Sequence, residues 1–251
     1  MLKKFFKINY IRLRISKILY VLRNPYFFSL TKNGMFPSVE HIKAINKIDK
    51  ASSLIDCGSN KGQFFTLFQY KKKITHLLCF DPIVTPHKAL KKLEKKNVKV
   101  YFEKCALSSV EKLLPFYVST REDSSSLMKI KSDSEKYFPD IKFSKKIHVQ
   151  VKTLDQYAKL ISKLPKPLAL KLDVQGSEYD LLIGSRNIIK FIKYIFIEIN
   201  ENSIYEMEPK SIKIINYLNK NGFDIVLKYN KIQSNMKIIS YDYLFINKLI
   251  R

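Results

Sequence analysis

The sequence predicts an α/β fold, in which helices cover both faces of a doubly wound, mostly parallel sheet whose last strand is antiparallel. Short apolar runs alternate with longer segments of helical pattern along most of the chain, which indicates repeated strand–helix–strand units. Several of the apolar runs end on an acidic residue. The 251 residues are 46% hydrophobic and 13% aromatic, which is enough to bury a full core.

The first 37 residues differ from the rest of the chain. They contain no acidic residue and interleave apolar with basic side chains, which are Lys3, Lys4, Lys7, Arg12, Arg14, Lys17, Arg23 and Lys32. This pattern predicts a basic amphipathic helical extension that is interrupted near Asn24-Pro25. Two roles remain open: residues 1–30 contact an anionic membrane or a lipid-linked substrate, or the extension packs on its own domain.

Residues 38–251 are expected to form one domain. Strands are predicted at 53–56, 75–81, 98–102, 147–151, 168–173, 194–198, 223–229 and 241–246, with an additional strand near 113–118. Helices are predicted at 38–48, from 61, at 86–96, from 154, through 181 and at 209–219. The polar segment 119–139 is either a mobile lid over a substrate or a plain surface loop.

The net charge of +24 has two interpretations, a nucleic-acid partner or a biased base composition. The chain has 40 lysines and only six arginines, although arginine is better suited to bidentate phosphate contacts. This ratio favours composition and makes a nucleic-acid partner unlikely. No apolar run is long enough to span a bilayer, no signal peptide is apparent, and the three cysteines indicate free thiols. We therefore expect a cytoplasmic protein; nothing in the sequence predicts an oligomeric state.

Ligands of such sheets bind outside the carboxyl ends of the strands, so the chemistry is sought there. The first strand ends in Asp56-Cys-Gly-Ser-Asn-Lys-Gly62. Gly58 permits a sharp turn and Gly62 permits close packing at the helix start. The G-x-G-x-x-G pattern of dinucleotide enzymes is absent, and an acidic opening suits a ligand with a positive group, such as S-adenosylmethionine. Asp81, at the end of the second strand, is placed to accept both ribose hydroxyls of a nucleoside.

Ordered motifs along the chain resemble those of the FkbM-type S-adenosylmethionine-dependent methyltransferases. Between about residues 53 and 229 they are D-x-G-x-N-x-G at 56–62, Phe-Asp-Pro at 80–82, Ala-Leu-Ser at 106–108, Ser-Ser-Ser-Leu at 124–127, Val-Lys-Thr-Leu-Asp at 151–155, Lys-Leu-Asp-Val-Gln-Gly-Ser-Glu at 171–178 and Phe-Ile-Glu at 196–198. Departures are small: Asp81 and Gln175 stand where Glu is frequent, Cys57 takes a usually aliphatic position, and a glycine after Ser109 is missing.

The resemblance implies a class I methyltransferase with a Rossmann-like sheet and S-adenosyl-L-methionine as its cofactor. Gly58, Asn60 and Gly62 would shape the methionine side of the pocket, and Asp81 would hold the ribose. Ala106 and Leu107 would flank the adenine. Asp56 would face the cofactor ammonium, directly or through water.

For the acceptor, the resemblance implies a hydroxyl group, of a sugar, a glycan or another small molecule. A hydroxyl is a poor nucleophile at neutral pH, so a carboxylate base would help. Asp173 or Glu178 is the predicted base, although Glu178 could instead cap the following helix, and Glu198 is a third candidate. These three acids could also hold Mg²⁺, but no metal is expected. Of the four histidines, only His41 has a claim to reach the site as a base, and surface or core packing is the favoured role of all four.

The alternative function is an RNA methyltransferase that uses the basic surface. An enzyme that methylates amino groups would usually show Asp/Asn-Pro-Pro-aromatic after the fourth strand, where this chain has Asp173-Val-Gln-Gly176. An enzyme that methylates cytosine carbon would need a Pro-Cys nucleophile, and no cysteine here follows a proline. A hydroxyl-directed O-methyltransferase is therefore the preferred hypothesis.

Overall fold

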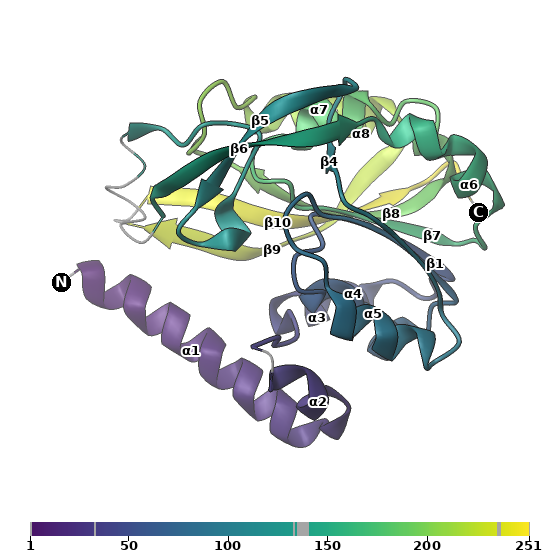
Figure 1. Ribbon diagram of the computed structural model, residues 1–251, viewed down its shortest axis with the longest axis horizontal. Helices are drawn as coiled ribbons and strands as arrows, with labels where there is room; N and C mark the ends of the chain where they lie inside the picture. The colour runs from purple at the N-terminus through teal and green to yellow at the C-terminus, as the bar shows by residue number, and fades with distance from the viewer. Residues whose placement is uncertain (1, 33, 133, 135–140, 235–236, 251) are drawn as a thin grey trace.

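The computed structural model describes residues 2–32, 34–132, 134, 141–234 and 237–250. Within them, seven strands form the main sheet in the order β3-β2-β1-β7-β8-β10-β9 (Figure 1). The strands are β1 (Ser53–Cys57), β2 (His76–Phe80), β3 (Lys99–Glu103), β7 (Leu168–Leu172), β8 (Ile192–Asn200), β9 (Phe223–Ser234) and β10 (Lys237–Asn247). Only β10 runs antiparallel to its neighbours β8 and β9. The predicted α/β fold with an antiparallel last strand is confirmed.

Helices cover both faces of this sheet (Figure 1). One face carries α3 (Ile42–Lys47), α4 (Gln63–Lys72) and α5 (His87–Glu94), and the other carries α6 (Ala158–Lys163), α7 (Glu178–Ile183) and α8 (Ser211–Lys220). Successive strand residues face opposite sides. Leu54 therefore joins the apolar core under α4, whereas Ile55 joins the core under α7. Short 3₁₀ turns complete the framework at Val39–His41, Leu154–Tyr157 and Ile189–Phe191.

A second sheet of three described strands lies beside the main one, in the order β4 (Ala106–Leu107), β6 (Phe143–Lys152) and β5 (Lys112–Ser119). The strands predicted near 113–118 and 147–151 are present. They pair with each other, antiparallel, and not with the main sheet. Their inward side chains form a small separate core with Ala106. This sheet becomes one wall of the site.

The N-terminal segment forms a single long helix, α1 (Leu2–Arg23), followed by a 3₁₀ turn at Pro25–Phe27 and by α2 (Phe28–Thr31). The predicted helix end near Asn24-Pro25 is confirmed. Val21 and Phe27 are buried in the same core as α4, and the Tyr70 hydroxyl donates to Asn24 Oδ1 at 2.9 Å. In the parts of the chain that are described, no helix is both long and apolar enough to cross a bilayer.

Candidate active site

The loop after β1 passes unusually close to the loop after β7. Gly58 has φ +77°, and a Cβ atom at this position would lie 1.9 Å from the backbone oxygen of Asp173. Only glycine fits this contact. Gly62 also has a left-handed backbone, and its missing Cβ makes room for the Phe65 ring where α4 begins. Gly58 thus lets the ends of β1 and β7 come together, whereas Gly62, which lines neither cavity described below, lets α4 pack closely at its start.

The Asp81 carboxylate is held by the backbone around it. The N–H groups of Ile83 and Val84 donate to Oδ1 at 2.9 and 2.7 Å, and that of Asn60 donates to Oδ2 at 2.9 Å. Burial raises the pKa of Asp81 while these backbone donors oppose the rise. Because a carboxylate has about four acceptor positions, Oδ2 keeps the capacity to accept a ligand hydroxyl.

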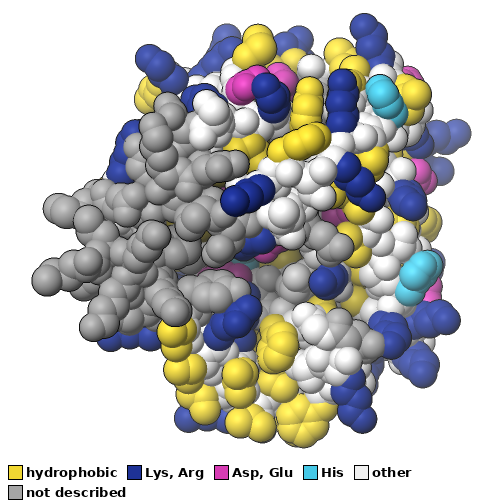
Figure 2. All heavy atoms as spheres, turned by 60° about the vertical axis from the view of Figure 1, so that its left-hand side comes forward, with side chains coloured by type: hydrophobic (Ala, Val, Ile, Leu, Met, Phe, Trp, Pro, Cys, Tyr) yellow, Lys and Arg dark blue, Asp and Glu magenta, His cyan; other side chains and the backbone are white. Residues whose placement is uncertain are grey.

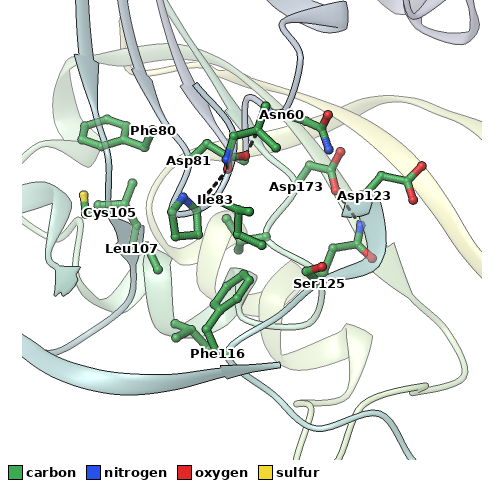
Figure 3. Close-up of a pocket in the computed structure, with 17 residues that line it drawn as sticks. Asn60, Phe80, Asp81, Ile83, Cys105, Leu107, Phe116, Asp123, Ser125 and Asp173 are labelled. Carbon is green, nitrogen blue, oxygen red and sulfur yellow. Dashed lines mark hydrogen bonds between the residues drawn. The ribbon is translucent and has the colours of Figure 1, made fainter. Parts of the chain in front are cut away.

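A cavity lies between these strand ends and the second sheet (Figure 3). Its wall includes the predicted cofactor residues Gly58, Asn60, Asp81, Ala106 and Leu107. The apolar part is completed by the side chains of Ile83, Phe116 and Leu127, and the polar part by Asp123, Ser125, Asp173 and Gln175. An apolar slot beside a fixed carboxylate fits the adenine and ribose of S-adenosylmethionine, and the close approach at Gly58 leaves backbone facing the ligand.

Asp56 does not line this cavity. It is fully buried, and the register of β1 and β7 sets it opposite Lys171, whose Nζ is 3.5 Å from Asp56 Oδ1. Burial raises the pKa of Asp56 to about 6, against the opposing effect of Lys171. Burial alone would lower the pKa of Lys171, but Asp173 and Asp56 raise it overall. The structure therefore gives Asp56 a buried cation as its partner. Its role toward the cofactor ammonium stays a prediction.

Asp173 lies at the centre of the site. Its Oδ2 is 3.1 Å from Lys171 Nζ, and its Oδ1 accepts a hydrogen bond of 2.7 Å from Gln175 Nε2. Burial would raise the pKa of Asp173, but Lys171 and Gln175 lower it overall, so the group is ionised at neutral pH. Asp173, Gln175 and Asp123 line the first cavity and also a second, larger one. The two cavities thus meet at Asp173.

The second cavity has a volume of about 820 Å³ and a lining of mixed charge, in which Arg14, Lys17, Arg121 and Lys231 accompany the acids. Glu40, Asp173, Glu198 and Asp242 contribute carboxylates, and one wall comes from Leu13, Arg14, Lys17 and Ile18 of α1. Apolar side chains complete the lining, among them those of Phe36, Ile141, Ile204, Ile232 and Ile239.

Three groups of this lining have strongly shifted pKa values; burial and the nearby Glu198 raise the pKa of Asp242 well above its usual range. Burial and the charge of Asp173 raise the pKa of Glu198 to about 7, although Ser240 and Gln175 donate hydrogen bonds to it. Burial lowers the pKa of His41 to about 4, so its imidazole is neutral at pH 7. His41 Nδ1 is 2.8 Å from the Tyr229 hydroxyl. From the sequence, packing is the favoured role of His41, whereas the structure places it in the cavity wall.

Glu178, the other predicted base, lines neither of these cavities. Its two carboxylate oxygens accept the backbone N–H groups of Val174 and Gly176, each at 2.9 Å. Burial raises the pKa of Glu178 to about 8. Its contacts hold the loop that carries Asp173 and Gln175, which is a structural role.

Three residues of the site, Lys171, Phe116 and Ser125, were not among the predicted site residues. The sequence does indicate that Lys171 is unusual, because it is the only charged residue in the buried strand Leu-Ala-Leu-Lys-Leu. Ser125 belongs to the segment 119–139, for which a lid and a plain surface loop are the two interpretations. Residues 119–132 and 134 of this segment are described, and residues 133 and 135–140 lie outside the described part. Phe116 reaches the site through the second sheet, which local sequence does not reveal. Among the described residues, no group of three or more His, Cys, Asp or Glu side chains is arranged to hold a metal ion.

Comparisons with known proteins identify the family. The domain described as "Methyltransferase FkbM domain" matches residues 56–225. No curated protein sequence matches significantly. Among solved structures, magnesium protoporphyrin IX methyltransferase from Synechocystis with bound S-adenosylmethionine has a TM-score of 0.44 at 8% identity, over 84% of this chain and 81% of the other. An rRNA methylase from Streptococcus thermophilus has a TM-score of 0.41 at 12% identity, over 83% and 94% of the two chains.

Structural likenesses of this size give no information about the acceptor. The family match, by contrast, covers well over half of the chain and begins at the Asp56 motif that shapes the cofactor cavity. The chain therefore belongs to the FkbM methyltransferase family, and S-adenosyl-L-methionine is its cofactor.

Proposed function

We propose that the protein transfers a methyl group from S-adenosylmethionine to a hydroxyl group of a sugar or glycan. The observation that carries this proposal is that Asp173 and Gln175 lie in the walls of both cavities. A cofactor in the first cavity and an acceptor in the second would meet at these two side chains.

The cofactor supplies an activated methyl group, so the protein has to align the acceptor oxygen and exclude water. Asp173 is the proposed base: it accepts a hydrogen bond from the hydroxyl and takes its proton as the new carbon–oxygen bond forms. A carboxylate of low pKa suffices, because the oxygen becomes strongly acidic during its methylation. Lys171 and Gln175 each hold one oxygen of Asp173 and so fix its orientation.

The lining of the second cavity supports an acceptor with many hydroxyl groups. Glu40, Asp173 and Glu198 offer hydrogen-bond acceptors, which suit sugar hydroxyls. Phe36 and Ile239 provide apolar surface for the C–H face of a sugar ring. A volume near 820 Å³ is in the range of small-molecule sites. RNA methylation is the alternative function, and the labelling experiment described next distinguishes it from glycan methylation. Cytoplasmic localisation stays a prediction.

The test combines cofactor binding with acceptor identity. Incubation with methyl-labelled S-adenosylmethionine and either a cell-envelope glycan fraction or total RNA should label the glycan fraction; label found only in RNA would contradict the proposal. Asp173→Asn should lose at least about 100-fold in transfer rate, in line with the loss of a base. Calorimetry should show that it still binds the cofactor, and Asp224→Asn, at an exposed ion pair, serves as the control.

A further inference from the structure

We propose that the solvent-facing side of α1 binds an anionic lipid bilayer. Ile11, Ile15, Leu19 and Leu22 are exposed, with 44, 49, 45 and 63% of their surface accessible. Their spacing of four, four and three residues places them on one side of the helix. The opposite side faces the body of the protein, where Val21 is buried and Tyr20 packs on the core. The apolar stripe formed by the four exposed residues therefore points away from the rest of the chain.

The positive charge of α1 indicates an anionic partner. The helix contains seven Lys and Arg residues and no Asp or Glu. Arg12 and Arg23 are exposed and lie at the edge of the apolar stripe, one position from Ile11 and Leu22. An apolar stripe with cationic borders is the pattern of helices that lie in the interface of an anionic membrane. Figure 2 shows hydrophobic side chains gathered with Lys and Arg along the lower edge of the molecule, where α1 and α2 lie in Figure 1.

A second copy of the chain fits this stripe less well. Two copies joined through the same stripe would bring Arg12 and Arg23 of both helices together without any acid of α1 to balance them. An acidic bilayer surface has no such conflict, because its phosphates neutralise the border residues. Charge complementarity thus favours the membrane.

Membrane binding would also hold the acceptor cavity near the bilayer, with the thickness of one helix, about 10 Å, between them. Leu13, Arg14, Lys17 and Ile18 of the same helix line that cavity, and Lys17 Nζ is 3.1 Å from Glu40 Oε1 within it. A sugar attached to a lipid would have to reach past α1 to enter the cavity. This consequence depends on the proposed function, whereas bilayer binding by α1 does not.

Flotation of the full chain with vesicles tests the surface. Vesicles of phosphatidylglycerol and phosphatidylcholine should bind the protein, and vesicles of phosphatidylcholine alone should bind it much less. The triple variant Ile15→Ser, Leu19→Ser, Leu22→Ser should partition at least tenfold more weakly. The matched control is Leu113→Ser, Ile212→Ser, Leu249→Ser, which removes three apolar side chains elsewhere that are even more exposed (65, 56 and 79% accessible) and should bind like the parent.

A second pair of variants tests the charge contribution. Arg12→Gln with Arg23→Gln should weaken binding to anionic vesicles, and Lys145→Gln with Lys146→Gln, two exposed residues on β6, should change it less. Calorimetry with S-adenosylmethionine shows for every variant whether the domain is folded, independently of vesicles and of the acceptor. The proposal is overturned if the parent does not bind anionic vesicles or if the stripe variant binds equally. A dimer that the stripe variant abolishes, without vesicle binding, would instead identify a self-interface and also overturn it.

Discussion

The Lys171 ammonium and the Asp173 carboxylate lie 3.1 Å apart, and both extend from the same side of the carboxyl end of β7. Residues two apart on a strand share a face, so this contact follows from the local chain geometry. Lys171 also lies 3.5 Å from Asp56 and donates to the backbone oxygen of Gly58 at 3.1 Å. One buried cation therefore links β1, the motif loop and the proposed base.

Removing this cation should destabilise the protein strongly. Lys171→Met would leave the Asp56 and Asp173 carboxylates without their common partner, at a cost of about 3–5 kcal/mol in the free energy of unfolding. Urea denaturation measures the loss. Lys248→Met, which breaks an exposed ion pair with Asp224, should cost less than about 1 kcal/mol. Equal losses in the two variants would contradict the central role of Lys171.

Gly58→Ala should be far more damaging than Gly34→Ala. Both glycines have a left-handed backbone, at φ +77° and +69°, so both alanines carry a conformational cost of about 1–2 kcal/mol. At Gly58 the new methyl group would also collide with the backbone oxygen of Asp173, whereas at Gly34 no described atom lies within 4 Å. We expect loss of cofactor binding by calorimetry for Gly58→Ala alone; normal binding by this variant would show that the two loops can separate.

Asp81→Asn should weaken binding of S-adenosylmethionine by about 10- to 100-fold, because it replaces a charged hydrogen-bond acceptor in the cofactor cavity. Calorimetry measures the change. Asp155→Asn is the control, since Asp155 Oδ1 also accepts backbone N–H groups, those of Asn187 and Ile188, away from the cavity. The prediction fails if both variants keep the affinity of the parent.

The stability of the protein should fall as the pH rises from about 5 to 8, in part through Glu178. Its folded-state pKa of about 8 lies above the usual value of 4.5, so folding retains a proton that the unfolded chain releases. The stabilisation by this group is complete below pH 4.5 and is lost as the pH passes through 8, by at most about 1.4 kcal/mol per pH unit. Urea unfolding of Glu178→Gln at several pH values should give a shallower dependence than the parent. An identical slope would exclude this titration.

The rate of methyl transfer should rise with pH through about 7. Burial and the nearby Asp173 raise the pKa of Glu198 to that value, and its ionised form adds an acceptor for substrate hydroxyls beside Asp173. The pH profile of kcat/KM for the free enzyme measures this limb. In Glu198→Gln the limb near pH 7 should disappear; its persistence would assign the titration to another group.

Most of the main sheet could be predicted because its strands are short, buried apolar runs separated by helices. Leu54 and Leu170 are completely buried, as such runs require. The pairing of β5 with β6 could not be predicted, because a strand pattern does not reveal which sheet the strand joins. For the same reason Phe116 was not recognised as part of the site.

For the candidate site, the positions at strand ends could be predicted, but the partner of a strand residue could not. Gly58, Asn60 and Asp81 follow strand ends, and strand ends meet at one edge of a parallel sheet, so their positions could be inferred. The partner of Asp56 depends on which strand lies next to β1, and local sequence does not specify strand order. The sequence therefore predicts a contact between Asp56 and the cofactor but does not reveal that Lys171 lies beside it.

The position of α1 makes one helix part of two surfaces. Its inward side chains, including Leu13 and Lys17, line the acceptor cavity, and its outward residues form the apolar stripe. A bilayer that binds the stripe and holds α1 in one position also holds one wall of the acceptor cavity. Membrane binding and acceptor binding are then thermodynamically linked. The reciprocal effect follows as well: an acceptor that tightens the cavity would strengthen attachment of the whole enzyme, and release of the methylated product would loosen it.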